Sequence, residues 1–282
     1  MKSKFTKGKA NRDTLDDRMK RYEEVTTGRT LIERLPTYAR IDGRAFHTFC
    51  RGLTKPFDPV FAEVMQKTVS YLVDKTNASV GYWQSDEISL AWQDPSKCPF
   101  ETRLFKLESV IASMATSAFT IYGLETELRD RILKFMPNFD CRVCQLPNMT
   151  ELANMFMFRE NDCVKNAITL VALSKFSHKS LQNANGIDKI RRLKEEVGVD
   201  FENDVDEIYR RGAYFRRENY FKVLTDDEIE RIPVEQRKLD DDGKMHAVRS
   251  RIVRFSLGAR LVDIENRPGA LFNKEIPKLK SK

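Results

Sequence analysis

Two aspartates sit where the chain is expected to turn, and together they suggest a chemistry. Asp42 ends an apolar segment and is followed by Gly43, whereas Asp86 lies in the polar run 84–87 between two apolar halves. Mg²⁺ in proteins is usually held by one or two carboxylates together with substrate phosphates. Two such ions can bind both the attacking and the leaving oxygen of a phosphoryl transfer. We therefore predict a magnesium site at Asp42 and Asp86, to which the turn at Gly43 adds a backbone carbonyl.

Either aspartate alone has an ordinary structural interpretation, because Asp-Gly turns and hairpin carboxylates are common. The residues around the pair strengthen the chemical interpretation, because several could bind phosphate: Arg44, His47, Lys55, Arg103 and Lys106. Backbone amides of the 43–47 turn could also cradle phosphate oxygens. His47 has a second interpretation as a buried structural histidine. No GxxxxGK[ST] or GxGxxG motif occurs, which disfavours P-loop and Rossmann nucleotide binding.

The elements that would position these residues follow from apolar periodicity and turn signals. A strand over 35–41 leads into Asp42, and Asp58-Pro59 starts a helix that runs to residue 74. A hairpin over 78–92 carries Asp86 at its tip, and a helix over 103–122 precedes a strand over 140–146. The predicted order is strand, helix, strand, strand, helix, strand, which is the split β-α-β arrangement of ferredoxin-like folds. Neighbouring strands of such a sheet bring the two carboxylates to one end.

Beyond Pro147 the pattern becomes mainly helical. Helices are predicted from residue 150, over 162–174 and over 187–197, followed by a capping box at 225–228 and a strand over 249–256. A helix over 14–26 precedes the first strand. We therefore predict an α+β fold with a catalytic domain over 15–148 and a mainly helical C-terminal region over 149–282.

The composition favours a protein without membrane spans that has a polyanionic partner. Charged residues make up 32% of the 282 residues, with a net charge of +7, and no apolar run approaches the ~20 residues that cross a bilayer. The stretch 209–217 interleaves four arginines with three aromatic residues. It could contact RNA by phosphate neutralisation and base stacking, or form part of a strand pair with its arginines in solvent. The basic segment 1–9 has the same two interpretations, an RNA-contacting arm or a solvated tail.

The five cysteines are odd in number and follow no disulfide spacing, which suits the reducing cytoplasm. Cys141 and Cys144 form a lone CxxC with no second pair, so we interpret them as strand residues and not as zinc ligands.

Three motifs with conserved order and spacing resemble the tRNA-histidine guanylyltransferase family and its 3′-to-5′ polymerase-like relatives. They are RIDGRAFHTF (40–49), TKPFD (54–58) and YWQSDE (82–87). The segments 139–142 and 158–166 resemble later parts of that family, and 209–212 does so more loosely. The resemblance spans roughly residues 15–215.

The resemblance implies a polymerase-like palm that adds nucleotides, usually GTP, to the 5′ end of tRNA after ATP has activated the 5′-phosphate. It implies two Mg²⁺ ions held by Asp42, Asp86 and the Gly43 carbonyl. The nucleotide would contact the turn from Asp42 to His47, including Ala45 and Phe46, together with Ser85, and Lys55 would bind its phosphates. Arg103 and Lys106 would lie near the activating triphosphate. A homo-oligomer, such as a tetramer, is also implied.

Two departures from the family pattern bear on the substrate. Ala45 replaces an asparagine of the eukaryotic enzymes, and the stretch 164–170 keeps only Asn166 of a motif that belongs to the tRNA-histidine-specific enzymes. Templated repair of 5′-truncated tRNA is therefore the preferred hypothesis over dedicated guanylylation of tRNA-histidine. The rival hypotheses from other classes are a palm-type nucleotidyl cyclase and an RNA-binding protein on a degenerate palm.

Overall fold

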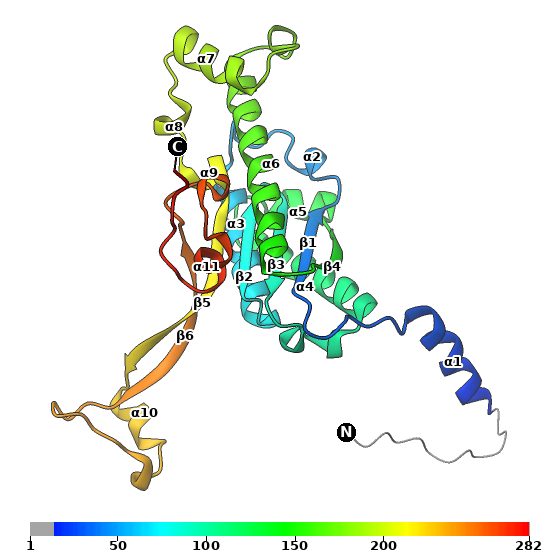
Figure 1. Ribbon diagram of the computed structural model, residues 1–282, viewed down its shortest axis with the longest axis vertical. Coiled ribbons are helices and arrows are strands. Elements are labelled where there is room, and N and C mark those ends of the chain that lie inside the picture. The colour runs from blue at the N-terminus through cyan, green and yellow to red at the C-terminus, as the bar shows by residue number, and fades with distance from the viewer. Residues whose placement is uncertain (1–13, 282) are drawn as a thin grey trace.

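An antiparallel sheet of six strands, in the order β4-β1-β3-β2-β5-β6, organises the computed structural model, which describes residues 14–281 (Figure 1). Its strands are β1 (Thr37–Gly43), β2 (Val80–Gln84), β3 (Glu87–Trp92), β4 (Phe139–Gln145), β5 (Ala213–Val223) and β6 (His246–Phe255). The basic segment 1–9 lies outside the described residues. The mixed α and β composition confirms the predicted α+β class.

The longer helices are α1 (Leu15–Thr27), α3 (Pro59–Thr76), α4 (Leu104–Leu124), α6 (Met149–Lys175) and α7 (Gly186–Val197). The shorter helices are α2 (Phe46–Phe49), α5 (Arg129–Phe135), α8 (Phe201–Asp204), α9 (Glu207–Arg211), α10 (Asp226–Glu230) and α11 (Arg267–Phe272). From β1 to β4 the major elements follow the predicted order: β1, α3, β2, β3, α4, β4.

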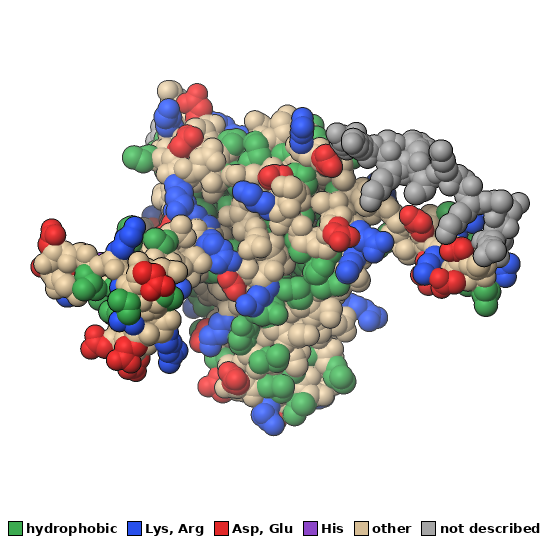
Figure 2. Space-filling view, turned by 90° about the horizontal axis from the view of Figure 1, so that it is seen from below, with side chains coloured by type: hydrophobic (Ala, Val, Ile, Leu, Met, Phe, Trp, Pro, Cys, Tyr) green, Lys and Arg blue, Asp and Glu red, His purple; other side chains and the backbone are tan. Residues whose placement is uncertain are grey.

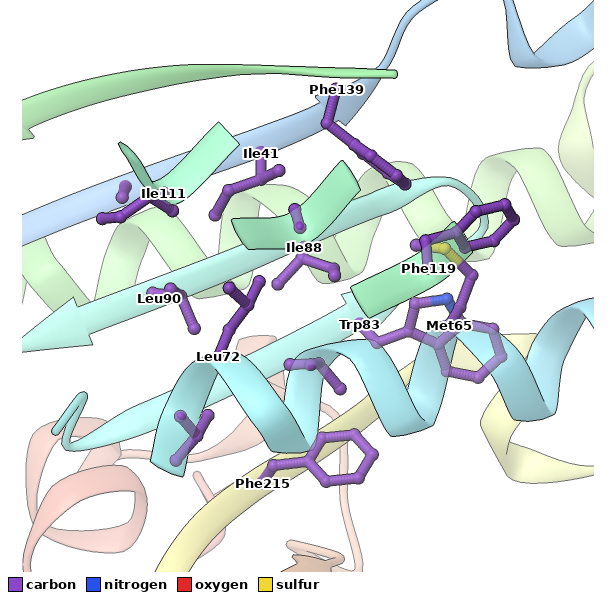
Figure 3. Close-up of a cluster of buried hydrophobic side chains, with 14 of the residues drawn as sticks. Ile41, Met65, Leu72, Trp83, Ile88, Leu90, Ile111, Phe119, Phe139 and Phe215 are labelled. Atoms are coloured by element: carbon purple, nitrogen blue, oxygen red, sulfur yellow. The ribbon is translucent and has the colours of Figure 1, made fainter. Parts of the chain in front are cut away.

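Helix α3 begins at the capping residue and proline that predict its start in the sequence. The Asp58 side chain accepts a hydrogen bond from the Phe61 amide at 2.9 Å, and Pro59 occupies the first helical position, where its missing N–H costs nothing. Helices α3 and α4 cover one face of the sheet with a buried apolar cluster (Figure 3). That cluster includes Ile41 and Ile88 from the strands, Leu72 from α3 and Ile111 from α4.

Helix α6 covers the other face. Its residues Leu152, Ala153 and Phe156 pack against Tyr38 and Tyr82 of the sheet. The prediction of two separate helices, with a break near Asp162, is wrong, because α6 is continuous over 27 residues. Asp162 does not cap a new helix. Its carboxylate forms an ion pair with Arg159 one turn earlier at 3.0 Å, which keeps it inside the helix.

The C-terminal region contributes two strands to the sheet in addition to its helices. Strand β5 pairs with β2 only over residues 213–215, whereas β5 and β6 pair with each other over 214–223 and 246–255. The outer part of this hairpin therefore extends beyond the sheet as an arm that carries α10 (Figure 1). The capping box predicted at 225–228 is present at the start of α10. The division into domains at residue 148 remains a prediction.

Helix α4 is the one described helix with the length and composition to cross a membrane. Leu107, Ile111, Ala115 and Phe119 on one of its faces are buried in the core, as is usual for a core helix. Charged side chains of both signs are interspersed on the face in Figure 2, so the net positive charge does not form one continuous basic patch there.

Candidate active site

The turns that carry Asp42 and Asp86 are connected by a backbone hydrogen bond. Asp42 is in register with Glu87 on the neighbouring strand, and Asp86 directly precedes Glu87 in a two-residue hairpin loop. The Gly43 amide donates a hydrogen bond to the Asp86 carbonyl oxygen at 3.1 Å. Ser85 accommodates the tight loop with a left-handed backbone, φ 50°. The two aspartates therefore meet at one end of the sheet.

The chain can make this turn because residue 43 lacks a side chain. A Cβ at Gly43 would lie 2.4 Å from Cδ2 of the Phe46 ring, well inside van der Waals contact. Phe46 cannot move away freely, because it is buried and packs against the rings of Phe49, Phe61, Phe119 and Phe139. Packing of the core thus fixes the backbone directly after Asp42.

The electrostatics of the pair suit a divalent cation. Burial, and then the negative charge of Asp42, raise the pKa of the Asp86 carboxyl. Neither aspartate forms an ion pair with any residue between 14 and 281. Two carboxylates and a backbone carbonyl are hard oxygen donors of the kind that Mg²⁺ prefers. Over the same residues there is no cluster of three or more His, Cys, Asp or Glu side chains able to hold a metal, so water and substrate oxygens would complete the coordination.

A cavity of about 500 Å³ opens beside Asp86. One wall is the hairpin tip with Trp83, Ser85 and Asp86, and the opposite wall comes from α6 and α9. The loop over 50–58 forms a third side, where Phe57 stacks on Tyr209 at 4.6 Å between ring centroids. The cavity is therefore built from segments on both sides of residue 148.

Five of the residues predicted to bind nucleotide line this cavity: Phe46, His47, Lys55, Ser85 and Asp86. His47 is exposed and its Nε2 lies 3.0 Å from the Thr48 hydroxyl, so the buried structural interpretation is wrong. Lys55 lies in a short loop that Asp58 braces, since the Asp58 carboxylate accepts hydrogen bonds from the amides of Thr54 and Phe61. Phe46 contributes as part of the apolar core beneath it.

Four of the remaining predicted residues lie in the turn but outside the cavity lining. Asp42, Gly43, Arg44 and Ala45 form the turn itself, and Ala45 has a left-handed backbone with φ 58°. The amide of Gly43 is bonded to Asp86 and that of Arg44 to the Asn138 carbonyl at 2.9 Å. These two amides are therefore not free to cradle phosphate, which limits that prediction to the amides of residues 45–47.

Arg103 and Lys106 are not brought to the cavity. They lie at the start of α4, and Phe119, which packs against Phe46 at 5.4 Å, lies fifteen residues after Leu104 along the helix. At 1.5 Å per residue this separates the start of α4 from the Asp42 turn by about 22 Å. Arg103 instead forms a β-bridge with Thr30 at the far end of the sheet.

A buried ion pair behind the site was not predicted from the sequence. Arg159 of α6 donates from Nε and Nη2 to the two carboxylate oxygens of Glu87, both at 2.7 Å. Because Glu87 follows Asp86 and pairs with Asp42, this contact anchors the hairpin tip to α6. The signal available in the sequence was the adjacent charged residues Arg159 and Glu160 within the segment that forms α6.

The arginine–aromatic stretch 209–217 forms the expected strand pair in part, since residues 214–217 of β5 pair with β6, and its contact with RNA remains a prediction. Part of it forms α9 and part forms β5, and each arginine has a carboxylate partner. The pairs are Arg210–Glu202, Arg211–Glu207 (2.6 Å), Arg216–Glu218 (2.8 Å) and Arg217–Asp74 (2.8 Å). The expectation of arginines free in solvent is wrong, and these side chains are engaged within the protein. Cys141 and Cys144 lie in β4, so the prediction that they are strand residues is confirmed.

Comparisons with known proteins converge on one family. The family model described as tRNAHis guanylyltransferase matches residues 16–147. A bacterial tRNA(His) guanylyltransferase (Thg1)-like protein, solved in complex with ATP, is 38% identical with a TM-score of 0.66, over 73% of this chain and 87% of that one. A second bacterial Thg1-like structure, in complex with GTP, is 31% identical with a TM-score of 0.61, over 86% of this chain and 91% of that one. The tRNA(His) guanylyltransferase of Debaryomyces hansenii is 28% identical over 203 residues, which cover 67% of this chain and 76% of the relative.

Proposed function

This chain belongs to the tRNA(His) guanylyltransferase family and is therefore a nucleotidyltransferase, and on that premise we propose that it adds nucleotides to the 5′ end of tRNA in the 3′-to-5′ direction. The observation that carries the proposal is the pair Asp42 and Asp86, which have no ion-pair partner among residues 14–281 and lie at hydrogen-bonded turns beside the cavity. A split β-α-β palm, inferred from the strand order β4-β1-β3-β2, accounts for their convergence.

The proposed substrates are ATP, GTP and tRNA. The bacterial relatives were solved with ATP and with GTP, and a cavity of about 500 Å³ falls within the ~300–1,000 Å³ usual for small-molecule sites. The tRNA 5′-phosphate attacks the α-phosphorus of ATP and pyrophosphate leaves. The 3′-hydroxyl of the incoming GTP then attacks the tRNA phosphorus and AMP leaves.

The residues of the cavity bind and orient these groups. Lys55 and His47 counter phosphate charge, and Ser85 and the Asp42 turn contact the nucleotide. Asp42, Asp86 and the Gly43 carbonyl would hold two Mg²⁺ ions, which when bound neutralise charge on the reacting phosphates. The Glu87–Arg159 pair keeps the hairpin tip, and with it Asp86, in a fixed position.

We favour templated repair of 5′-truncated tRNA over dedicated guanylylation of tRNA-histidine. The stretch that departs from the histidine-specific enzymes, 164–170, lies in α6, and Asn166, Ala167 and Leu170 line the cavity. Base pairing with the opposite strand of the acceptor stem can select the incoming nucleotide, so the protein need only hold the A-form helix by shape and backbone.

The test of the chemistry is addition of labelled GTP to a tRNA that lacks its first nucleotide, with ATP and Mg²⁺ present. Asp42→Ala and Asp86→Ala should each abolish addition, whereas the exposed Asp130→Ala on α5 serves as the matched control. Circular dichroism should show folded protein in all three. Activity of either site variant within about tenfold of the wild type, a barrier change of only ~1.4 kcal/mol, would contradict the two-metal assignment.

The test of the substrate varies the base opposite the missing nucleotide in tRNAs with different anticodons. Incorporation of the complementary nucleotide in each case supports repair. Guanylate joined only to the histidine acceptor, whatever the opposing base, would establish the dedicated enzyme instead. Cyclic or dinucleotide products formed from ATP or GTP without tRNA would favour the cyclase.

We also propose that the protein is a cytoplasmic homo-oligomer. Light scattering on the full chain measures the size of the oligomer.

A further inference from the structure

A second cavity, of about 560 Å³, lies on the other side of helix α9 from the active-site cavity. Ile208 and Tyr209 of α9 line the first cavity, whereas the next two residues, Arg210 and Arg211, line the second. The floor and far wall come from the turn over 258–263 and the C-terminal segment over 279–281. Helix α9 thus contributes neighbouring residues to both cavities.

The lining of the second cavity carries six charged side chains, with an excess of positive charge. Its charged residues comprise four cations, Arg210, Arg211, Arg260 and Lys280, and two carboxylates, Glu202 and Asp263. By contrast, the active-site cavity has two lysine or arginine side chains in its longer lining, Arg51 and Lys55. A cavity of this character suits an anion better than an apolar or cationic ligand.

The charges of the two α9 arginines are neutralised by ion pairs within the protein. Arg210 pairs with Glu202 and also donates from Nε to the Val205 carbonyl at 2.6 Å, and Arg211 pairs with Glu207. Among residues 14–281, the side chain of Arg260 has one hydrogen-bond partner, the neutral side-chain oxygen of Asn161 at 3.1 Å. The Lys280 ammonium has no carboxylate partner among residues 14–281. Arg260 and Lys280 therefore supply the unneutralised charge.

Two guanidinium donors beside the cavity are also unsatisfied. The Nε atoms of Arg211 and Arg260 are buried and have no hydrogen-bond partner among residues 14–281, and leaving a buried donor unpaired is unfavourable. Glu160 lies near both arginines, but its carboxylate accepts from the Leu261 amide at 2.7 Å and bonds to neither guanidinium. Because neighbouring atoms cover both Nε atoms, an anion would reach them only after the guanidinium group rotates. After that rotation the unpaired donor takes part in a charge-assisted, bidentate hydrogen bond.

We propose that this second cavity binds a phosphate group, with Arg260 and Lys280 as its principal ligands. Arginine presents donors in a fork that matches phosphate oxygens, and lysine adds a point charge. The phosphate can come from the backbone of the tRNA or from a second nucleoside triphosphate. In both cases the ligand sits behind α9, whose opposite side lines the active-site cavity.

The test uses the full chain and the charge-removing variants Arg260→Gln, Lys280→Gln and the double variant. Lys278→Gln is the matched control, because Lys278 is exposed two residues away and does not line the cavity. Lys280 is exposed as well, so its variant retains the fold even if Arg260→Gln does not. Calorimetric titration with tripolyphosphate, and filter binding of 5′-truncated tRNA at several salt concentrations, distinguish the two sources.

If the phosphate belongs to tRNA, the double variant binds tRNA about tenfold more weakly than the control. The slope of log affinity against log salt also falls by about one, as for loss of one to two phosphate contacts. If it belongs to a nucleotide, tripolyphosphate binding loses one equivalent and tRNA affinity is unchanged. Binding of both probes that matches the Lys278→Gln control in all three variants overturns the proposal. That result leaves the proposed activity untouched, since it depends on the aspartates of the other cavity.

Discussion

The buried carboxyl of Glu160 on α6 predicts how the stability of this protein changes with pH. The Glu160 side chain is 1% exposed on α6, and burial raises the pKa of its carboxyl from the ordinary 4.5 to about 7. The folded protein therefore holds the proton of Glu160 at pH values where the unfolded chain has released it. This group contributes stability that is fully present below pH 4.5 and is lost as the pH rises to about 7.

The magnitude follows from the two pKa values. Between pH 5 and pH 8 the linkage relation gives a loss of about 2.5 kcal/mol in the free energy of unfolding from this one residue. Glu160→Gln removes the titration but keeps a side-chain oxygen that can accept from the Leu261 amide. We therefore expect the variant and the wild type to have similar stability at pH 5, and the variant to be more stable by about 2–3 kcal/mol at pH 8.

Urea denaturation followed by circular dichroism at both pH values measures this difference. All other titrating groups are common to the two proteins and cancel in the comparison. Glu195→Gln, at an exposed position of α7, controls for the loss of one surface carboxylate. A stability difference between Glu160→Gln and the wild type that stays constant within about 0.5 kcal/mol from pH 5 to pH 8 would refute the assignment of a buried, protonated Glu160.

Three further predictions concern the active site. Gly43→Ala places a Cβ 2.4 Å from the Phe46 ring, so we expect a loss of about 1–3 kcal/mol in urea denaturation together with a large loss of nucleotide addition. Arg159→Met leaves the buried Glu87 carboxylate without its partner and should destabilise the fold by about 3–5 kcal/mol; adding Glu87→Gln should restore part of that loss, and no recovery would contradict the reasoning. Lys55→Ala should raise the KM for nucleotide several-fold in steady-state assays while filter binding of tRNA is unchanged, and the opposite pattern would reassign Lys55 to tRNA.

The local elements could be predicted because their signals lie close together in the sequence. Asp58 and Pro59 start α3 through contacts within one turn, and the hairpin around Asp86 is bounded by its own apolar strands. The walls of the cavity could not be placed in this way. The Arg159–Glu87 contact joins residues 72 positions apart, and the stacking of Tyr209 on Phe57 joins residues 152 positions apart (209 − 57).

The contrast between local and long-range contacts also explains two wrong predictions, the break in α6 and the solvent-exposed arginines of 209–217. Asp162 looks like a helix start when its sequence neighbours alone are considered, but Arg159 neutralises it one turn earlier inside a longer helix. For the stretch 209–217, the composition indicates charge, but only the fold shows which carboxylates come within reach. Arg217, for example, pairs with Asp74 at the end of α3.

The order of strands in the sheet has a consequence for synthesis of the chain in the cell. Strand β2 lies between β3 and β5, and Trp83 pairs with Ala213, which is 130 residues further along the chain. At ordinary translation rates, one edge of β2 stays unpaired for on the order of ten seconds after β2 leaves the ribosome. This edge has the uncharged sequence VGYWQ, and all five of its residues are buried in the finished fold. An open, uncharged strand edge readily pairs with other chains, so the nascent protein is most exposed to aggregation, and most in need of a chaperone, until β5 arrives to cover it.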